Sequence, residues 1–247
     1  MADSQRQDSI RGVADIVFLI DATGSMEPCI ESLKANIGTF IDSLVTGGTN
    51  APSPVKDWRA KAVAFRDVGA DGDAWFEDSP FVRDVGALKA QLAAIVAKGG
   101  GDEPESMLEG LYRVITMGQK DVPAQADEPH KWRARGQASR AVVIFTDASF
   151  KEPLEAPPEA KGATLDVDIK NLIVAHKISV HLFAPDMDCH ERLSELQRVS
   201  WQAVARRGED PVEGLRHFTT DQANFQRVLD NLAKTVSASA AAETIVA

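Results

Sequence analysis

The sequence lacks several features that define common classes of protein. Its 247 residues include only two cysteines, Cys29 and Cys189, and no Cys-x-x-Cys pair, so no disulfide framework can be read from it. No apolar run approaches the length that spans a membrane. The first residues also lack the basic-then-apolar pattern of a secretory signal peptide. We therefore expect a cytoplasmic protein with reduced thiols.

Lys and Arg are fewer than Asp and Glu in this sequence. The chain has 27 Lys and Arg against 37 Asp and Glu, which gives a net charge of −10. Attraction to phosphate groups needs clustered Lys and Arg, so this balance argues against a nucleic-acid or anionic-membrane partner. An acidic chain is compatible with a cation-binding site, although acidity alone is mostly a solubility feature.

The common catalytic motifs are also missing. The sequence contains no Walker Gly-x-x-x-x-Gly-Lys-Ser/Thr loop, no kinase glycine-rich loop and no Gly-x-Ser-x-Gly elbow. No pair of nucleophile and base can be read from it. We therefore expect that the chain is not an enzyme.

The most informative stretch that is present is an apolar run followed by oxygen-bearing side chains. Ile16 to Ile20 predicts a strand buried on both faces, and it leads directly into Asp21-x-Thr23-x-Ser25. Gly24 permits a turn that brings this carboxylate and these two hydroxyls to one point, and oxygen ligands of this kind suit Mg²⁺. The alternative is that Asp21, Thr23 or Ser25 only caps the helix expected over Glu27 to Leu44.

A second apolar run repeats this arrangement later in the chain. Ala141 to Phe145 predicts another buried strand, and Thr146 and Asp147 follow it. If the two strands are neighbours in a parallel sheet, Asp21 and Asp147 lie side by side. Two carboxylates held close together repel each other, and a bound cation removes that cost.

A glycine-rich loop supplies further acids. Gly99 to Gly101 precede Asp102, Pro104 and Glu105, and a helix is expected to begin near Pro104. Asp102 can cap that helix and can also reach a nearby metal ion, so the two interpretations do not exclude each other.

The remaining pattern completes an α/β fold. We expect a doubly wound, mostly parallel central sheet with helices on both faces, one antiparallel edge strand, a single domain over residues 13–236, a flexible tail over 1–12 and an Ala-rich tail over 237–247. The other expected elements are a strand at 59–65, a solvated hairpin turn at 67–73, edge-strand segments at 75–76 and 80–82, helices at 85–96, 167–177 and 188–207, strands at 178–183 and 215–219, and a closing helix at 221–236.

With these three loops in order, the chain resembles the von Willebrand factor type A (VWA) family. The metal-ion-dependent adhesion site of that family combines an Asp-x-Ser-x-Ser motif, a Thr or Asp in a glycine-rich second loop and an Asp after the fourth strand. Asp21, Thr23 and Ser25 match the first motif, with Thr in place of the first Ser, and Asp147 matches the last position. Asp102 is the match for the middle ligand, with Glu105 as the alternative.

The details of the loops suggest a subgroup. Gly-Gly-Gly-Asp-x-Pro-Glu, Phe65-Arg66-Asp67 and Thr146-Asp147-Ala148 look like the loops of alpha-kinase-associated and intracellular bacterial VWA proteins. The resemblance covers residues 13 to 236.

The resemblance implies a Mg²⁺-dependent protein-interaction module, a cytoplasmic signalling or regulatory adaptor, with Mn²⁺ or Ca²⁺ as alternative ions. A protein partner would complete the metal sphere with an Asp or Glu. Three carboxylates already neutralise Mg²⁺ and weaken capture of an external acid, so a purely structural metal is a second interpretation. The alternative functions are a metal-dependent enzyme, or a regulatory subunit of an ATPase/chelatase- or kinase-type complex.

Overall fold

The protein is built around one six-stranded sheet with the order β3-β2-β1-β4-β5-β6. In the computed structural model, residues 12–46, 55–101, 103–119, 127–134 and 136–242 are described. The strands are β1 Val13–Asp21, β2 Asp57–Phe65, β3 Phe76–Asp78, β4 Ser139–Phe145, β5 Ile178–Ala184 and β6 Val199–Ala203. The longer helices are α1 Glu27–Thr46, α3 Val85–Ala94, α4 Met107–Thr116, α7 Pro211–Thr220 and α8 Gln222–Ala242, and the shorter ones are α2 Val68–Asp71, α5 Lys170–Ala175 and α6 Asp188–Ser194.

The strand pairing confirms the expected doubly wound sheet. β1 pairs in parallel with β2 on one side and with β4 on the other, and β5 and β6 continue the parallel order. β3 pairs antiparallel with β2 at the edge. The two apolar runs of the sequence are therefore neighbours, with Ile20 opposite Phe145, and their carboxyl ends lie at the same edge of the sheet.

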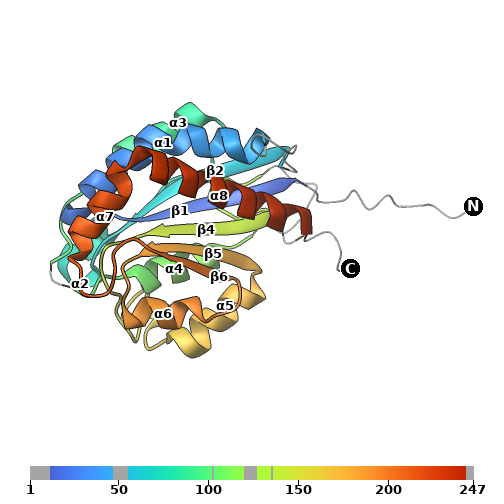
Figure 1. Ribbon diagram of the computed structural model, residues 1–247. Coiled ribbons are helices and arrows are strands. Elements are labelled where there is room, and N and C mark those ends of the chain that lie inside the picture. Colours follow the sequence, from blue (N-terminus) through green and yellow to red (C-terminus); the bar gives the residue numbers. More distant parts are fainter. Residues whose placement is uncertain (1–11, 47–54, 102, 120–126, 135, 243–247) are drawn as a thin grey trace, which may run out of the picture.

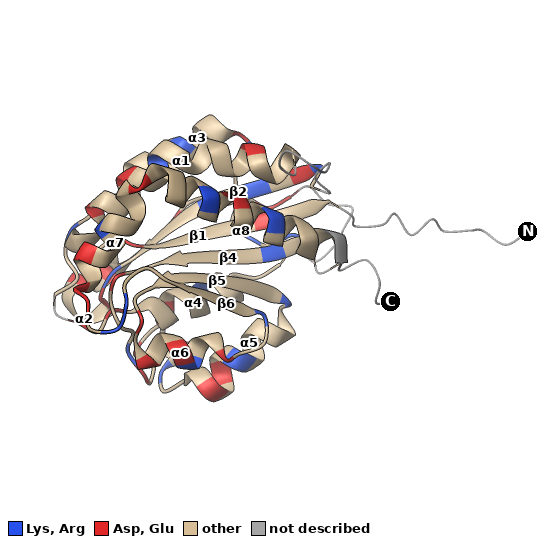
Figure 2. Ribbon diagram, viewed as in Figure 1, with Lys and Arg blue, Asp and Glu red and all other residues tan. Residues whose placement is uncertain are grey.

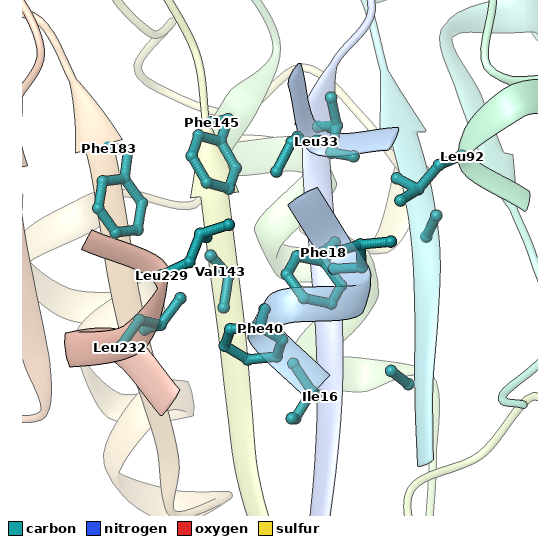
Figure 3. Close-up of a cluster of buried hydrophobic side chains, with 14 of the residues drawn as sticks. Ile16, Phe18, Leu33, Phe40, Leu92, Val143, Phe145, Phe183, Leu229 and Leu232 are labelled. Carbon is teal, nitrogen blue, oxygen red and sulfur yellow. The ribbon is translucent and has the colours of Figure 1, made fainter. Parts of the chain in front are cut away.

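Helices cover both faces of the sheet (Figure 1). Ile16 and Phe18 on β1 belong to the core shared with α1, α3, α7 and α8, where Phe18 packs edge-on against Phe40 (Figure 3). Val17 and Leu19 belong to a second core on the side of α4 and α5. Because both faces of β1 are covered, its central run from Ile16 to Ile20 is apolar without alternation. Charged residues lie mainly on the helices and loops (Figure 2).

The helix expected over 188–207 was wrong in its second half. α6 ends at Ser194, and Val199–Ala203 forms the edge strand β6. Val180 to Ala184 of β5 supply the hydrogen-bonding edge for it. Pairing with β5, across the intervening helix α6, makes this segment a strand, and the helical spacing of its apolar residues does not show this.

The strand expected over 215–219 was also wrong, because α7 occupies this segment. Asp210 caps α7, and its carboxylate accepts hydrogen bonds from the backbone N–H groups of Val212 and Glu213. Pro211 occupies the first turn, where its missing N–H costs nothing. The Asp-Pro pair was the available sequence signal for this helix start.

The segment between β2 and β3 holds a short helix in place of the expected hairpin turn. Asp67 caps the one-turn helix α2 by accepting a hydrogen bond from Gly69 N at 2.7 Å. The antiparallel edge strand itself is confirmed for Phe76. Trp75 lies in a 3₁₀ turn, and Val82 contributes only an isolated bridge to Ala60.

The start of α4 and the end of α8 differ by several residues from those predicted. α4 begins at Met107, beyond Pro104, because Glu105 forms a parallel bridge with Phe150 and keeps the chain extended there. α8 continues to Ala242, where a frayed tail from Ser237 was predicted. The hydroxyl of Ser237 donates to Leu44 O, and the Ala240 side chain is buried. None of the described helices is long and apolar enough to cross a membrane.

Candidate functional site

Asp21 lies at the carboxyl end of β1 and is fully buried. Its Oδ1 accepts hydrogen bonds from Thr23 N at 3.0 Å and from Thr23 Oγ1 at 2.7 Å. Its Oδ2 accepts a hydrogen bond from Thr146 Oγ1 at 2.7 Å, so this carboxylate joins the loop after β1 to the loop after β4. Sequence reasoning did not assign a role to Thr146, although its place directly before Asp147 was the available signal.

Asp147 is the second acid of this edge and is 3% exposed. Burial raises its pKa, and a hydrogen bond with Ser25 lowers it in part. Its Oδ2 is buried and has no hydrogen-bond partner among the described residues. A buried carboxylate oxygen without a donor is costly, so it marks a position that suits a cation.

The charge of Asp147 also acts on Asp21. Burial, followed by the charge of Asp147, raises the pKa of Asp21 to about 7. In the described part of the chain, no Lys or Arg forms an ion pair with either acid. Thr23 Oγ1 and Ser25 Oγ lie 3.4 Å apart beside them. This edge therefore combines two buried carboxyl groups and two hydroxyls, all oxygen donors that suit a hard divalent cation.

The second loop approaches the same edge. Gly100 has φ of +98°, and a Cβ atom added to it would lie 2.4 Å from Thr23 Cγ2 and 2.7 Å from Glu105 Oε1. Only glycine fits this position, because the Thr23 and Glu105 side chains fill the space that a larger residue needs. Asp102, the predicted middle ligand, lies outside the described residues.

Arg66 fixes the second loop against the first. Its buried guanidinium donates to the carbonyl oxygens of Ala22, Lys98 and Val96, at 3.1, 3.1 and 2.8 Å. It also pairs with Glu77 at 2.6 Å. In the sequence Arg66 is only part of a loop pattern, and the structure shows that it joins the second loop to the first.

The sequence-predicted residues are therefore partly brought together. Asp21, Thr23, Ser25 and Asp147 meet at the carboxyl edge of β1 and β4. Among the described residues, which exclude Asp102, no group of three or more His, Cys, Asp or Glu side chains is arranged to hold a metal ion. A bound ion would have to draw these acids closer, and Asp147 Oδ2 has no hydrogen-bond partner among the described residues to give up.

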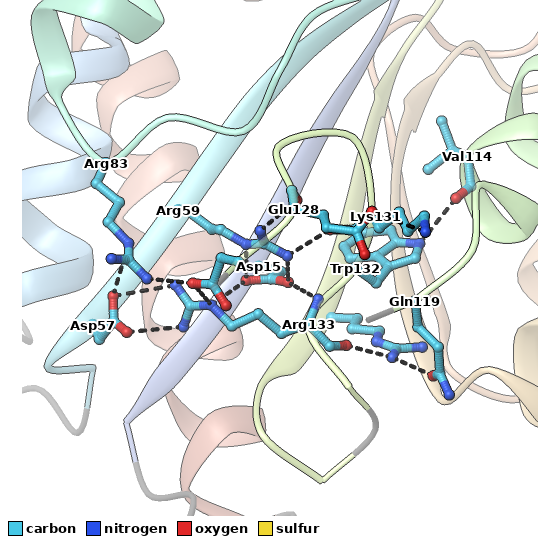
Figure 4. A network of polar contacts seen from close by, with 12 residues as sticks. Asp15, Asp57, Arg59, Arg83, Val114, Gln119, Glu128, Lys131, Trp132 and Arg133 are labelled. Atoms are coloured by element: carbon cyan, nitrogen blue, oxygen red, sulfur yellow. Dashed lines mark hydrogen bonds and ion pairs between the residues drawn. The ribbon is translucent and has the colours of Figure 1, made fainter. Parts of the chain in front are cut away.

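At the opposite end of the sheet, a buried acid is paired with arginine side chains. Asp15 lies near the start of β1 and is fully buried, as Asp21 is. Arg59 donates to both of its oxygens, at 2.9 and 2.7 Å, and Arg133 lies 3.3 Å away (Figure 4). Asp15 is thus neutralised by two arginines, whereas Asp21 and Asp147 at the other edge have no ion-pair partner among the described residues.

A hollow of about 800 Å³ lies beside the second loop. It is lined by Phe150, which forms the bridge with Glu105, and by Pro104 and Lys151 on either side of that bridge. Its wall also carries Lys161 and Arg192. The hollow offers a concave surface of mixed charge along the loop that follows β4.

Comparison with solved structures shows which fold this chain has. No protein-family model and no curated protein sequence matches the chain. Among solved structures, the VWA domain of SpRpn10 is similar with a TM-score of 0.50 and 9% identity, covering 82% of this chain and 93% of that one. The chain has the VWA fold, which confirms the fold that the loop motifs predicted.

Two further similar structures are parts of larger proteins. The pilus adhesin SpaC from Lactobacillus rhamnosus GG has a TM-score of 0.47 and 14% identity over 87% of this chain, which spans 30% of the adhesin. Proximal thread matrix protein 1 from the mussel byssus has a TM-score of 0.45 and 12% identity over 90% of this chain, which spans 47% of that protein.

Proposed function

We propose that this chain is a protein-interaction module that binds a divalent cation, Mg²⁺ first, at the carboxyl edge of β1 and β4. The observation that carries the proposal is the pair of adjacent buried acids, Asp21 and Asp147, with no cationic side chain beside them. A cation would remove their repulsion and supply the missing partner of Asp147 Oδ2.

In this proposal each residue type has a separate task. Asp21 and Asp147 supply most of the negative charge, and the hydroxyls of Thr23 and Ser25 complete the set of oxygen donors. The second loop supplies a further ligand, for which the sequence offers Asp102 or Glu105. Mn²⁺ and Ca²⁺ take the same donor atoms and are alternative ions.

The bound cation would attract one oxygen ligand from a protein partner. The resemblance implies an Asp or Glu side chain in that role, and the attraction for an acid depends on the net charge of the loaded site. A signalling or regulatory adaptor in the cytoplasm is the biological setting that we propose, without catalytic activity of its own. The loop after β4 carries Asp147 and, from Phe150 onward, also lines the hollow, so a partner could contact both.

Metal titration and partner capture test this function together. Calorimetry should detect Mg²⁺ binding to the wild-type chain and a loss of at least about tenfold in affinity in Asp147→Asn. The immobilised wild-type chain should retain a protein partner in Mg²⁺ and release it in EDTA, and Asp147→Asn should not retain it. Retention that is equal in Mg²⁺, in EDTA and in the variant would contradict a metal-dependent interaction.

A further inference from the structure

β6 is the last strand of the described sheet, so only one of its two edges is paired (Figure 1). On the paired edge, Val180 N donates to Arg198 O at 2.8 Å, and Val204 N donates to Ala184 O at 3.1 Å. Alternate residues of a parallel strand bond to the same neighbour, so the even-numbered residues of 198–204 face β5. The odd-numbered residues between them face away from the sheet.

The backbone groups on the outward edge belong to Val199, Trp201 and Ala203. Val199 N already donates to Leu196 O at 3.2 Å. In the described part of the chain, nothing bonds to Val199 O or to the backbone N–H and C=O groups of Trp201 and Ala203. A row of unmade backbone hydrogen bonds of this kind is a template for one more strand.

β6 also lacks the features that usually protect an edge strand. Its five residues, VSWQA, include no charge and no proline. β3 at the opposite edge carries Glu77 and Asp78 among its three residues. Ser200, Gln202 and Ala203 are exposed, so the β6 edge is open to another chain.

There is room beside this edge for the side chains of an added strand. A hollow of about 170 Å³ separates Ser200 and Gln202 from α8. On the other face, Trp201 Nε1 donates to Ala184 O at 3.1 Å, which holds the indole ring against β5. Neither α8 nor the ring of Trp201 therefore closes the edge.

We propose that β6 pairs antiparallel with β6 of a second copy of this chain, about a two-fold axis at Trp201, and so joins two sheets into one. On this axis the N–H and C=O of Trp201 bond to those of Trp201 in the second copy. Ala203 N donates to Val199 O of the second copy, and the reverse bond forms as well. The outward groups of one copy thus supply donors and acceptors for the other. The pairing does not depend on the proposed cation site.

The side chains match in the same register, which favours a second copy as the occupant. Ser200 lies opposite Gln202 of the second copy, in both directions, so a hydroxyl meets an amide on the α8 side. Val199 lies opposite Ala203 on the other face. No charged residue of one copy then faces a like charge of the other within the paired strands.

Charge also selects between the possible registers. An axis that placed Trp201 opposite Ala203 would satisfy the same outward edge. It would also set Arg198 opposite Arg206 of the second copy, and like charges directly opposite each other destabilise a strand pair. The axis at Trp201 avoids this repulsion.

A proline on the outward edge tests the pairing. Ala203→Pro removes an outward N–H and no bond to β5, and proline is tolerated on edge strands. Ala203→Ser is the matched control, because it keeps the N–H. Sedimentation of the full chain in EDTA, over about a hundredfold range of concentration, should show a dimer that dissociates on dilution for wild type and Ala203→Ser. Dissociation of Ala203→Pro should occur at a concentration at least about tenfold higher.

Cysteine cross-linking tests the register independently and does not rely on the proline variant. Residues opposite each other in a non-hydrogen-bonded antiparallel pair have Cα atoms about 4.5 Å apart, which a disulfide can bridge. The double variant Ser200→Cys/Gln202→Cys should give a covalent dimer on oxidation. Gln202→Cys alone should not, because its equivalent in the second copy is not opposite it.

Each result has a defined consequence. A wild type that is monomeric at every concentration would overturn the proposal and leave the β6 edge to a strand of another protein. Equal dissociation of wild type and of folded Ala203→Pro, with folding checked by melting curves, would overturn β6 as the interface. A covalent dimer of Gln202→Cys alone would overturn the axis at Trp201. Because the measurements are made in EDTA, failure of the cation site would not change them.

Discussion

Buried charge in this protein is distributed unevenly between its residues. Asp15 has Arg59 and Arg133 as close partners, whereas Asp21, Glu105 and Asp147 have no arginine or lysine in direct ion-pair contact among the described residues. Leaving a buried carboxyl group unpaired raises its pKa and costs stability. A bound cation would offset this cost at Asp21 and Asp147.

His181 is a buried titratable side chain far from these acids, under α8. It is 6% exposed, its Nδ1 lies 2.8 Å from Ser200 Oγ, and burial lowers its pKa to about 4. The pKa is lower in the folded than in the unfolded chain, so neutral His181 adds stability above about pH 6.5 and loses it as the pH falls through about 4.

We therefore expect His181→Gln to have a flatter dependence of stability on pH than wild type. The free energy of unfolding of the wild type should fall between pH 7 and pH 4 by up to about 3 kcal/mol more than that of the variant. Urea denaturation at a series of pH values, in EDTA, measures the difference. Parallel curves for the two proteins would show that His181 is not buried as a neutral group.

At the scale of elements, the second loop depends on a glycine that no other residue can replace. Gly100 and Gly208 both have positive φ, +98° and +85°. A Cβ at Gly100 would meet Thr23 and Glu105, whereas a Cβ at Gly208 would meet nothing within 4 Å. The two positions therefore share the backbone strain and differ in the steric clash.

Gly208→Ala should cost about 1 kcal/mol of unfolding free energy, from strain alone. Gly100→Ala should cost clearly more, about 2–4 kcal/mol, and should weaken metal binding because Thr23 and Glu105 must move. Chemical denaturation and metal titration of the two variants measure these effects. Equal destabilisation would mean that the second loop does not pack against Thr23 as described.

The elements differed in how well the sequence predicted them. β1 and β4 were predictable because burial on both faces leaves continuous apolar runs. β6 was not, since an edge strand with several exposed residues lacks that run and is defined by its pairing with β5. The start of α7 is marked in the sequence by the cap at Asp210 and by Pro211, and the strand prediction for 215–219 does not use this signal.

At the scale of the whole molecule, the strand order can be predicted from general rules for α/β folds. The full set of residues at the candidate site cannot be predicted from these rules. Alternation of strands and helices requires a mostly parallel sheet, and its two most apolar strands take the centre. That places Asp21 and Asp147 together. The position of Glu105, in contrast, depends on a bridge to Phe150 that local patterns cannot reveal, and Asp102 lies outside the described residues.

A metal at the junction of three loops should stabilise the entire fold. A ligand that binds only the folded state adds about 2.7 kcal/mol at one hundred times its dissociation constant, which corresponds to a rise of roughly 5–10 °C in Tm for a chain of this size. Asp21→Ala removes one carboxylate and its repulsion with Asp147, along with the hydrogen bonds from Thr23 and Thr146. The variant should still fold.

Thermal melts during a Mg²⁺ titration test the central claim most directly, with wild type and Asp21→Ala compared after removal of metal by EDTA. The Tm of the wild type should rise with Mg²⁺ concentration, and the Tm of Asp21→Ala should stay constant over the same range. An equal rise in both proteins, or no rise in the wild type, would contradict a cation site at the carboxyl edge of β1 and β4.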